Sequence, residues 1–422
     1  MQAVPAAPVA GTAATSAPGS AAVSALARCT AVDPGEFGSR HWSRAPLLTR
    51  AADLPGGFED LLSDADVDEL VAERGLREPF FRLVRDGAGL GGATRTVTAG
   101  ARRIGDLADP ARVSDLHLQG ATLVLQSLHR LHPPVARFCR RLAEELGHAA
   151  QCNAYVTPGG DAQGFDFHHD THDVFVLQVS GRKRWLVHDP VLELPLPSQP
   201  RAGDGLVTPG AAPLLDVVLE AGDCLYLPRG FVHAALTTAE HSVHLTVGVL
   251  STTWYDVLQD AVALAADDPS FRAALPVQPA EAAAEQLPAF LQHAAAWLAA
   301  LPPEQVRERL DARLARAAPP EPVRLLAQAA AVRRVDLQTW VRPRRGLPVR
   351  LEEGGGAVAV VLPDRRITVP AVASRALRAL LAGPCTPGRL TAGQPVDGPG
   401  LDAEGALVLV RRLLREGALV PA

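Results

Sequence analysis

The chain has 422 residues and a formal net charge of −5, and 47% of its residues are hydrophobic whereas 5% are aromatic. This length predicts roughly two to four compact units, and the weak charge gives no global attraction to nucleic acid or to membranes. No run of about eighteen apolar residues occurs, so we predict no membrane span. The five cysteines are scattered without a Cys-x-x-Cys pair, which predicts neither disulfides nor a zinc knuckle and favours the reducing cytoplasm.

Residues 1–38 are rich in Ala, Pro, Ser, Gly and Thr, and no basic residue precedes Arg28. A secretory signal has a positively charged start and a continuous apolar segment, and this stretch has neither. We therefore predict a disordered tail.

The next segments have the patterns of ordinary secondary structure. Phe58–Glu73 has helical character, and Ser63 and Asp64 are alternative caps. Gly120–Leu128 alternates apolar and polar residues, as a first barrel strand would. Pro133–Leu146 opens with prolines, has apolar residues at helical spacing and stops before a glycine, which predicts a helix.

A chemical signature first occurs in Asn153–Trp185, whose centre is His168-His169-Asp170. On an extended strand alternate side chains share a face, so His168 and Asp170 would have Cβ atoms roughly 6–7 Å apart. That separation suits a small cation held between an imidazole and a carboxylate. A single His-x-Asp is not specific, because about one copy is expected by chance in this composition. The β-branched residues that follow, Val174–Val179, predict a strand.

A second stretch, Glu220–Leu250, supplies a third donor. Its pattern predicts a short strand at Cys224–Leu227, a tight turn, a strand through His233 and a final strand at Ser242–Leu250. With the earlier pair, His233 can complete a set of two histidines and one carboxylate. Such a set occupies one face of an octahedral metal and leaves three positions open, as in non-haem Fe(II) oxygenases.

In combination, these motifs resemble the JmjC-type (cupin-like) 2-oxoglutarate oxygenases, and most nearly their ribosomal oxygenase branch of protein hydroxylases. The resemblance rests on the order Asn-x-Tyr, His-x-Asp, Gly-x-Lys-x-Trp, Gly-Asp-x-Leu-Tyr-x-Pro-Arg-Gly and a later histidine, over about Gly120–Leu250. It implies a 2-oxoglutarate-dependent dioxygenase in which His168, Asp170 and His233 bind Fe(II).

The resemblance also places the cosubstrate. It implies that Lys183 binds the distal carboxylate of 2-oxoglutarate and that Asn153, Tyr155 and Thr246 lie near this molecule. Lys183 is the only lysine in the chain, against forty arginines, and a compact ammonium suits a confined pocket better than a guanidinium does. The alternatives are a lysine retained on a solvated turn and, for the other three residues, ordinary barrel lining.

The remaining histidines of these stretches have less specific patterns. We predict that His169 faces away from the metal as a surface or packing residue. His172 lies roughly 13 Å along the strand from His168, too far to share a metal. It lines the substrate mouth or is a plain core or surface histidine. The other three are predicted to be structural: His188, His241 and His244.

Beyond Leu250 the composition changes. Ser251–Ala331 is rich in Ala, Leu, Glu and Arg, and helices of roughly ten to seventeen residues fit between its prolines. The predicted breaks are at Pro269, Pro276, Pro279, Pro288, Pro302-Pro303 and Pro319-Pro320. Leu287–Leu301 is so apolar that it needs a partner surface. The resemblance implies a helical dimerisation module here, and a helical layer within one chain is the alternative.

The last segment follows a basic stretch, Arg333–Arg350. Two short strands, a helix, a loop, a second helix and a terminal strand suggest a winged-helix-like domain, which the resembled family also carries. Winged helices bind nucleic acid or proteins. The second helix has only a small basic cluster, which favours protein contact.

The resulting prediction is an α+β chain with a disordered tail (1–38), a double-stranded β-helix of the cupin/JmjC type (39–250), a helical dimerisation module (251–345) and a winged-helix-like domain (346–422). The resemblance implies a homodimeric hydroxylase of a ribosomal or other cytoplasmic protein. The rivals are a cupin-like metal-binding or assembly protein without turnover and a nucleic-acid-binding regulator. Demethylation is a variant within the enzyme class, because hydroxylation of an N-methyl carbon releases formaldehyde.

Overall fold

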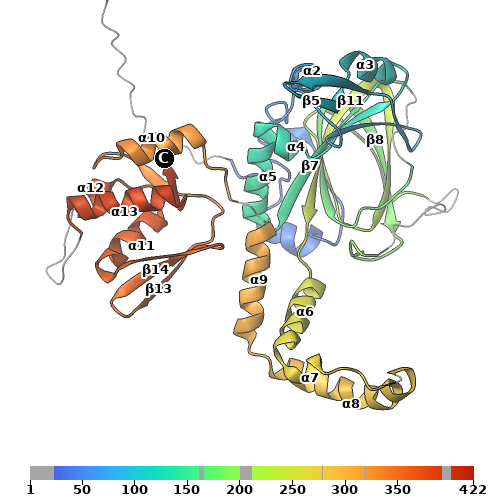
Figure 1. Cartoon of the computed structure of the whole chain (residues 1–422). Coiled ribbons are helices and arrows are strands. Elements are labelled where there is room, and N and C mark those ends of the chain that lie inside the picture. Colours follow the sequence, from blue (N-terminus) through green and yellow to red (C-terminus); the bar gives the residue numbers. More distant parts are fainter. Residues whose placement is uncertain (1–22, 161–165, 200–211, 278, 318–319, 392–400) are drawn as a thin grey trace, which may run out of the picture.

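The computed structural model of the chain contains a curved β-sheet, a group of helices that extends away from it, and a separate C-terminal unit (Figure 1). It describes residues 23–160, 166–199, 212–277, 279–317, 320–391 and 401–422. The first 22 residues of the predicted tail lie outside this described part.

The predicted disordered tail is wrong for residues 23–38, which pack against the sheet. Leu26 and Phe37 are buried in its hydrophobic core. The Glu145 carboxylate accepts a hydrogen bond from the backbone N–H of Leu26 at 2.8 Å. The composition suggested disorder because it is rich in small residues and proline, but Leu26 and Phe37 have partners more than a hundred residues away in sequence.

The sheet has nine strands within the described residues. They are β1 (Leu47–Thr49), β2 (Phe81–Arg85), β3 (Ala88–Leu90), β6 (Thr122–Leu125), β7 (Ala149–Thr157), β8 (Asp173–Pro190), β9 (Leu215–Leu219), β10 (Cys224–Leu227) and β11 (Phe231–Leu250). Their order is β1-β10-β8-β11-β7-β6-β2-β3, with β9 paired to β8. The sheet curls into a barrel (Figure 1), so that its inward side chains surround a cavity.

Strand β11 differs from the expectation of two separate strands through His233 and at Ser242–Leu250. It is continuous, and it pairs with β8 on one side and, over Ser242–Leu250, with β7 on the other. Register shifts occur between Thr237 and Ser242 and again after Val243. The residues between Thr237 and Ser242, which suggested a break between two strands, are such an irregularity within one strand. Pairing with the long strand β8 continues on both sides of them.

Short elements cover the outside of the barrel. These are α1 (Pro34–Glu36), η1 (Phe37–His41), η2 (Ala51–Asp53), α2 (Asp64–Ala72), α3 (Pro110–Leu118), α4 (Leu128–Leu131), α5 (Pro133–Leu146) and the hairpin of β4 (Thr94–Ala99) and β5 (Arg102–Ala108). Helix α5 has the predicted bounds and ends at Gly147, whose φ of 72° suits glycine. Helix α2 begins at the predicted cap Ser63, which forms a reciprocal capping box with Asp66.

The helices after the barrel extend away from one of its ends (Figure 1). They are α6 (Trp254–Ala263), η3 (Leu264–Asp267), α7 (Pro269–Arg272), α8 (Pro279–Ala300) and α9 (Pro303–Ala317). The predicted break at Pro288 is wrong, because α8 continues through it. An internal proline costs about 3 kcal/mol, and the Ala, Leu, Glu and Gln residues around Pro288 are strong helix formers. Among the described helices, none has the length and apolar content of a membrane span.

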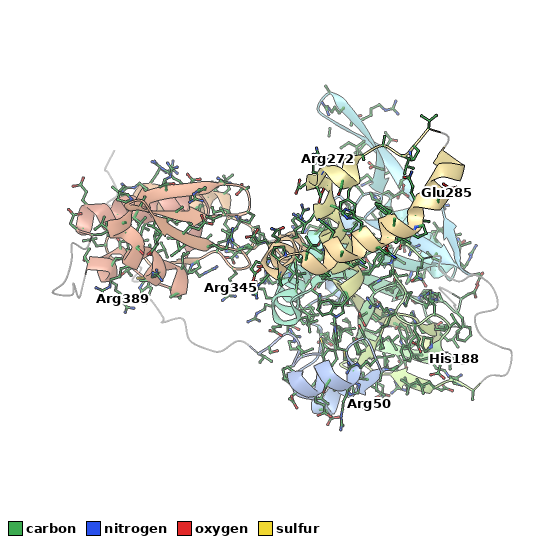
Figure 2. The ribbon with its side chains drawn as sticks, turned by 90° about the horizontal axis from the view of Figure 1, so that it is seen from below. Arg50, His188, Arg272, Glu285, Arg345 and Arg389 are labelled. Atoms are coloured by element: carbon green, nitrogen blue, oxygen red, sulfur yellow. The ribbon has the colours of Figure 1, made fainter. Side chains whose placement is uncertain are left out.

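The C-terminal unit has its own hydrophobic core. Its elements are α10 (Leu325–Arg334), β12 (Val341–Pro343), β13 (Arg350–Gly354), β14 (Ala357–Val361), β15 (Arg366–Pro370), η4 (Ala371–Ala373), α11 (Ser374–Ala382), α12 (Pro387–Thr391), α13 (Ala403–Arg415) and β16 (Leu419–Pro421). Figure 2 marks Arg389 on this unit and Arg272 and Glu285 on the preceding helices.

The C-terminal unit starts earlier than the predicted residue 346. Val335 and Val341 belong to its core, and β12 pairs with β16. Gln328 on α10 donates hydrogen bonds to the carbonyl oxygens of Leu414 and Leu419 at 2.6 and 2.8 Å. The start of this unit could not be recognised from the basic stretch Arg333–Arg350. Its apolar side chains lie between the arginines in sequence, but in the structure they face the core.

Candidate metal centre

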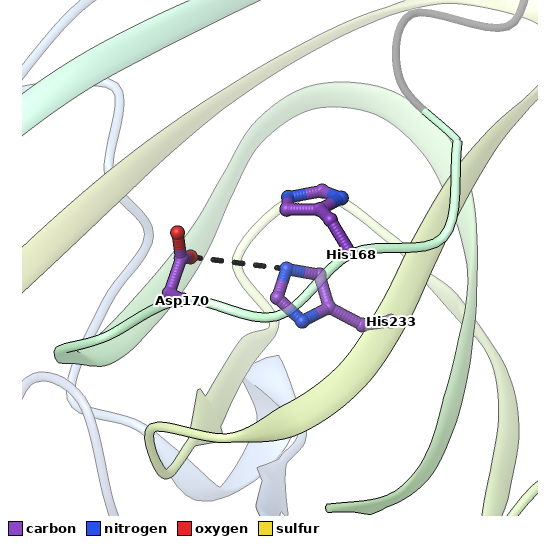
Figure 3. Close-up of side chains that lie close together, drawn as sticks. All are labelled: His168, Asp170 and His233. Carbon is purple, nitrogen blue, oxygen red and sulfur yellow. Dashed lines mark ion pairs between the residues drawn. The ribbon is translucent and has the colours of Figure 1, made fainter. Parts of the chain in front are cut away.

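Three side chains converge at one wall of the barrel (Figure 3). One ligand atom each from His168, Asp170 and His233 lies within 4.8 Å of the other two, and His233 Nε2 is 3.9 Å from Asp170 Oδ2. His233 lies on β11. His168 and Asp170 precede β8 and are not part of a regular strand, contrary to the expectation of an extended H-x-D strand. The backbones of His168 and His233 instead exchange two hydrogen bonds, of 3.1 and 2.8 Å, which hold the two histidines side by side.

Both imidazoles are oriented by backbone carbonyl groups. His168 Nδ1 lies 2.8 Å from the carbonyl oxygen of Asp166, and His233 Nδ1 lies 3.0 Å from that of Phe231. Because a carbonyl oxygen only accepts, each Nδ1 carries the hydrogen and each Nε2 keeps its lone pair for a metal. Burial and the neighbouring His168 lower the pKa of His233 to about 4, so this ring is neutral at neutral pH, as a ligand must be. The donor set fits Fe(II).

A cavity of about 340 Å³ adjoins these three residues. It is lined by all seven residues that the sequence singled out: His168, Asp170, His233, Lys183, Asn153, Tyr155 and Thr246. The structure therefore brings the predicted site together, although the roles of its residues stay predictions.

Lys183 lies in the cavity wall on β8 and is only 3% exposed. Its ammonium donates a hydrogen bond to Thr157 Oγ1 at 2.9 Å, and it forms no ion pair within the described residues. Burial lowers the pKa of Lys183 to about 7. A buried ammonium of this kind is a strong site for an anion, because a bound carboxylate would replace the lost hydration.

Asn153 and Tyr155 lie on β7, with their side chains on one face. Asn153 Oδ1 accepts a hydrogen bond from the backbone N–H of Ser127 at 2.9 Å, which fixes the amide. The Tyr155 ring stacks on His244, with centroids 4.9 Å apart and an interplanar angle of 2°. Burial, together with the Asp170 carboxylate, raises the pKa of Tyr155 to about 12, so its hydroxyl stays a hydrogen-bond donor.

Two further cavity residues were missed or misassigned. His244 was predicted to be structural, and Trp185 was used as part of the Gly-x-Lys-x-Trp motif without a role at the site, yet both are buried and line the cavity. Within the described part of the chain, Trp185 Nε1 and His244 Nδ1 have no hydrogen-bond partner. The sequence did contain a signal, because His244 and Thr246 alternate on one strand. By contrast, His169 is buried but does not line this cavity, in agreement with its predicted direction.

The register shifts in β11 decide which side chains reach the cavity. His233 and Ala235 face it from one half of the strand, and His244 and Thr246 face it from the other half. Strict alternation would put the two pairs on opposite faces, because the first pair has odd numbers and the second has even numbers. The face of β8 that points into the cavity also changes from even-numbered to odd-numbered residues near Gly181, which pairs with Ser242.

The comparisons with known proteins agree with this site. The JmjC domain family matches residues 125–257. Ribosomal oxygenase 1 of Gallus gallus is 35% identical, over 58% of this chain and 40% of its own length. The bifunctional lysine-specific demethylase and histidyl-hydroxylase NO66 of Drosophila persimilis is 28% identical, over 52% of this chain and 30% of its own length. The chain thus spans less than half of the length of these relatives.

A solved structure shares the fold. The ribosomal oxygenase YcfD of Escherichia coli, in complex with cobalt and 2-oxoglutarate, superposes with a TM-score of 0.52 at 20% identity. The match covers 92% of this chain and 98% of YcfD. The predicted resemblance to JmjC-type ribosomal oxygenases and the cupin-like fold are therefore confirmed.

Proposed function

We propose that this chain, whose JmjC domain relates it to the ribosomal oxygenases, is an Fe(II)- and 2-oxoglutarate-dependent dioxygenase that hydroxylates a side chain of a ribosomal protein. One observation carries the proposal. Two oriented imidazoles and a carboxylate share a single cavity with a buried ammonium that has no carboxylate partner within the described residues. A divalent metal and a dicarboxylate together would satisfy this arrangement.

His168, Asp170 and His233 would hold the iron. Bound iron would supply the activation of O₂, coupled to conversion of 2-oxoglutarate into succinate and CO₂. The protein holds both imidazoles in the correct tautomer, and the Asp170 carboxylate contributes a negative charge. The enclosed walls keep bulk water away from the reacting groups.

Lys183 would bind the distal carboxylate of 2-oxoglutarate. Thr157 accepts one ammonium hydrogen, so the remaining N–H bonds are available to the ligand. Asn153, Tyr155 and Thr246 line the same space and would contact the cosubstrate through amide and hydroxyl groups. In this arrangement the single lysine has a function that an arginine would not serve, because a guanidinium needs more room.

The test is succinate release from 2-oxoglutarate with added Fe(II). The His168→Ala and Asp170→Ala variants are expected to lose turnover, because each removes a metal ligand. His241→Ala is the matched control, since His241 is exposed and does not line the cavity. Its Nε2 lies 3.3 Å from Asp64 Oδ2. Equal turnover in the wild type and both ligand variants would reject the proposal.

The target is tested with ribosomal proteins from a strain that lacks this gene. Incubation with the enzyme should add the mass of one oxygen atom to one of them. Release of formaldehyde with loss of a methyl group would instead indicate demethylation. A ribosomal target would agree with the predicted cytoplasmic location.

The helical module would form a homodimer. Helices α6 and α8 expose apolar side chains that a monomer leaves in water: Trp254, Leu258, Val262, Phe290 and Leu291. An exposed apolar surface of this kind is typical of a protein interface. A second copy of this chain would cover it.

The C-terminal unit would act as a winged-helix-like protein-contact domain. Some of its exposed arginines are paired with neighbouring carboxylates, as in the Arg365–Glu416, Arg366–Glu352 and Arg378–Glu353 pairs. Paired arginines have little charge left for phosphates. Salt-dependent binding of the protein to DNA or RNA would contradict this assignment.

A further inference from the structure

We infer that His172 positions the substrate protein where a peptide-binding groove opens into the metal cavity; the inference rests on the proposed function. A second cavity, of about 500 Å³, shares His172 and Gln151 with the metal cavity. It continues from there to Tyr255 and Gln259 on α6 and to Arg313 on α9. The two spaces therefore adjoin at His172 and Gln151, between the outer helices and the metal ligands.

Gly248 makes room for the His172 ring. A Cβ atom built at Gly248 would lie 2.5 Å from His172 Nε2. Any residue other than glycine at this position would therefore displace the His172 ring. Gly248 lies inside β11, paired with Gln151 and Val174 on its two neighbours. Glycine weakens the interior of a strand, so its presence there indicates a close approach, and the structure identifies His172 as the approaching group.

The His172 imidazole has no hydrogen bond within the described part of the chain, and it is half-buried. Other histidines of this region are held by the protein: His168 and His233 by carbonyl oxygens, and His148 Nδ1 by the backbone N–H of Thr252 at 3.2 Å. His172 thus presents a donor and an acceptor to whatever fills the groove.

The groove is rich in hydrogen-bond donors. Arg229 lines it and forms no ion pair within the described residues. Gln151, Gln259 and Thr171 also line it. An extended peptide offers a carbonyl acceptor at every residue, so a segment of the substrate protein fits this surface. The target side chain would then pass His172 and enter the metal cavity.

The test uses total ribosomal protein from the deletion strain as the probe and measures its stimulation of succinate release. His172→Ala should raise the half-saturating concentration of ribosomal protein about tenfold, while the KM for 2-oxoglutarate changes less than about twofold. His172→Gln keeps a hydrogen-bonding side chain and should recover most of the loss. His241→Ala is the control histidine and should change neither value.

A second variant blocks the outer end of the groove. Gln259→Trp should raise the same half-saturating concentration about tenfold by filling the space. Leu118→Trp, at an exposed position on α3, is its control. If ribosomal protein does not stimulate the wild type, the proposed function fails and this inference with it. If it stimulates the wild type and the His172 and Gln259 variants equally, this inference alone is wrong.

Discussion

The Lys183 ammonium and the Thr157 hydroxyl are joined by a hydrogen bond of 2.9 Å at the buried wall of the cavity. No carboxylate within the described residues forms an ion pair with this ammonium. Below pH about 7 the folded ligand-free protein therefore holds a cation that is only partly compensated, at a cost in stability that a bound anion would relieve.

Lys183→Met should weaken 2-oxoglutarate binding at least about thirtyfold, the equivalent of about 2 kcal/mol. Below pH about 7 the same change should raise the thermal unfolding midpoint of the ligand-free protein, because it removes a buried charge. Arg184→Met is the matched control, since Arg184 is exposed and paired with Asp216. An unchanged KM for 2-oxoglutarate in Lys183→Met would refute the assigned role.

The pH dependence of binding follows from the same residue. Burial lowers the pKa of Lys183 from 10.5 to about 7, whereas a bound carboxylate would favour the ammonium. Binding should therefore take up a proton near and above pH 7, and 2-oxoglutarate affinity should fall as the pH rises. Titration calorimetry in two buffers of different ionisation enthalpy measures this uptake, which Lys183→Met should abolish.

The stability contribution of Lys183 has a defined sign. Between pH about 7 and 10.5 the unfolded chain holds the lysine proton and the folded ligand-free protein does not. Unfolding free energy should therefore increase with pH across this window in the wild type relative to Lys183→Met. Parallel pH profiles for the two proteins would show that the lysine is not buried as described.

Asp173 anchors the segment that carries His168 and Asp170. This carboxylate is fully buried and accepts hydrogen bonds from Tyr226 at 2.9 Å, Ser43 at 3.1 Å and Ser251 at 2.8 Å. Tyr226→Phe should lower the unfolding free energy by about 1.5–3 kcal/mol in denaturant titrations, because the bond is made to a charged group.

Tyr255→Phe is the control for this change, because Tyr255 is about half exposed. It should leave the unfolding free energy within about 0.5 kcal/mol of the wild type. If Tyr226→Phe also changes the unfolding free energy by less than about 0.5 kcal/mol, the hydrogen bonds to Asp173 do not stabilise the fold.

Leu291→Glu should convert a dimer into monomers, as measured by sedimentation or light scattering. The side chain is 57% exposed on α8, and a carboxylate there would be buried in the interface without a partner. Leu118→Glu, on the remote helix α3, should leave the mass unchanged. A monomeric wild type would overturn the proposed dimer directly.

Much of the site was predictable because its signals are local. The triad and Lys183 belong to two short stretches whose residue order is distinctive, and all four line one cavity. Helix α5 and strand β10 have the predicted bounds, since prolines and glycines mark their ends.

The missed features depend on long-range contacts. Residues 23–38 are ordered by side chains of the distant barrel, and the early start of the C-terminal unit depends on pairing between β12 and β16. His244 and Trp185 alternate with Thr246 and Lys183 along their strands, but it is the pairing between β8 and β11 that brings these two faces into one cavity. Composition and periodicity contain no information on such partners.

Because the cavity-facing side changes along β8 and β11, the direction of Lys183 depends on the number of residues near Gly181 more than on the identity of most of them. A one-residue deletion near Gly181 that left the β11 register shift in place would reverse Lys183 relative to Val174 and Val176. The resulting protein could still assemble its metal ligands while its ammonium pointed to solvent. Natural variants of the chain should therefore differ here by substitution, except at Gly181, where a side chain would collide with the His241 carbonyl, and rarely by insertion or deletion.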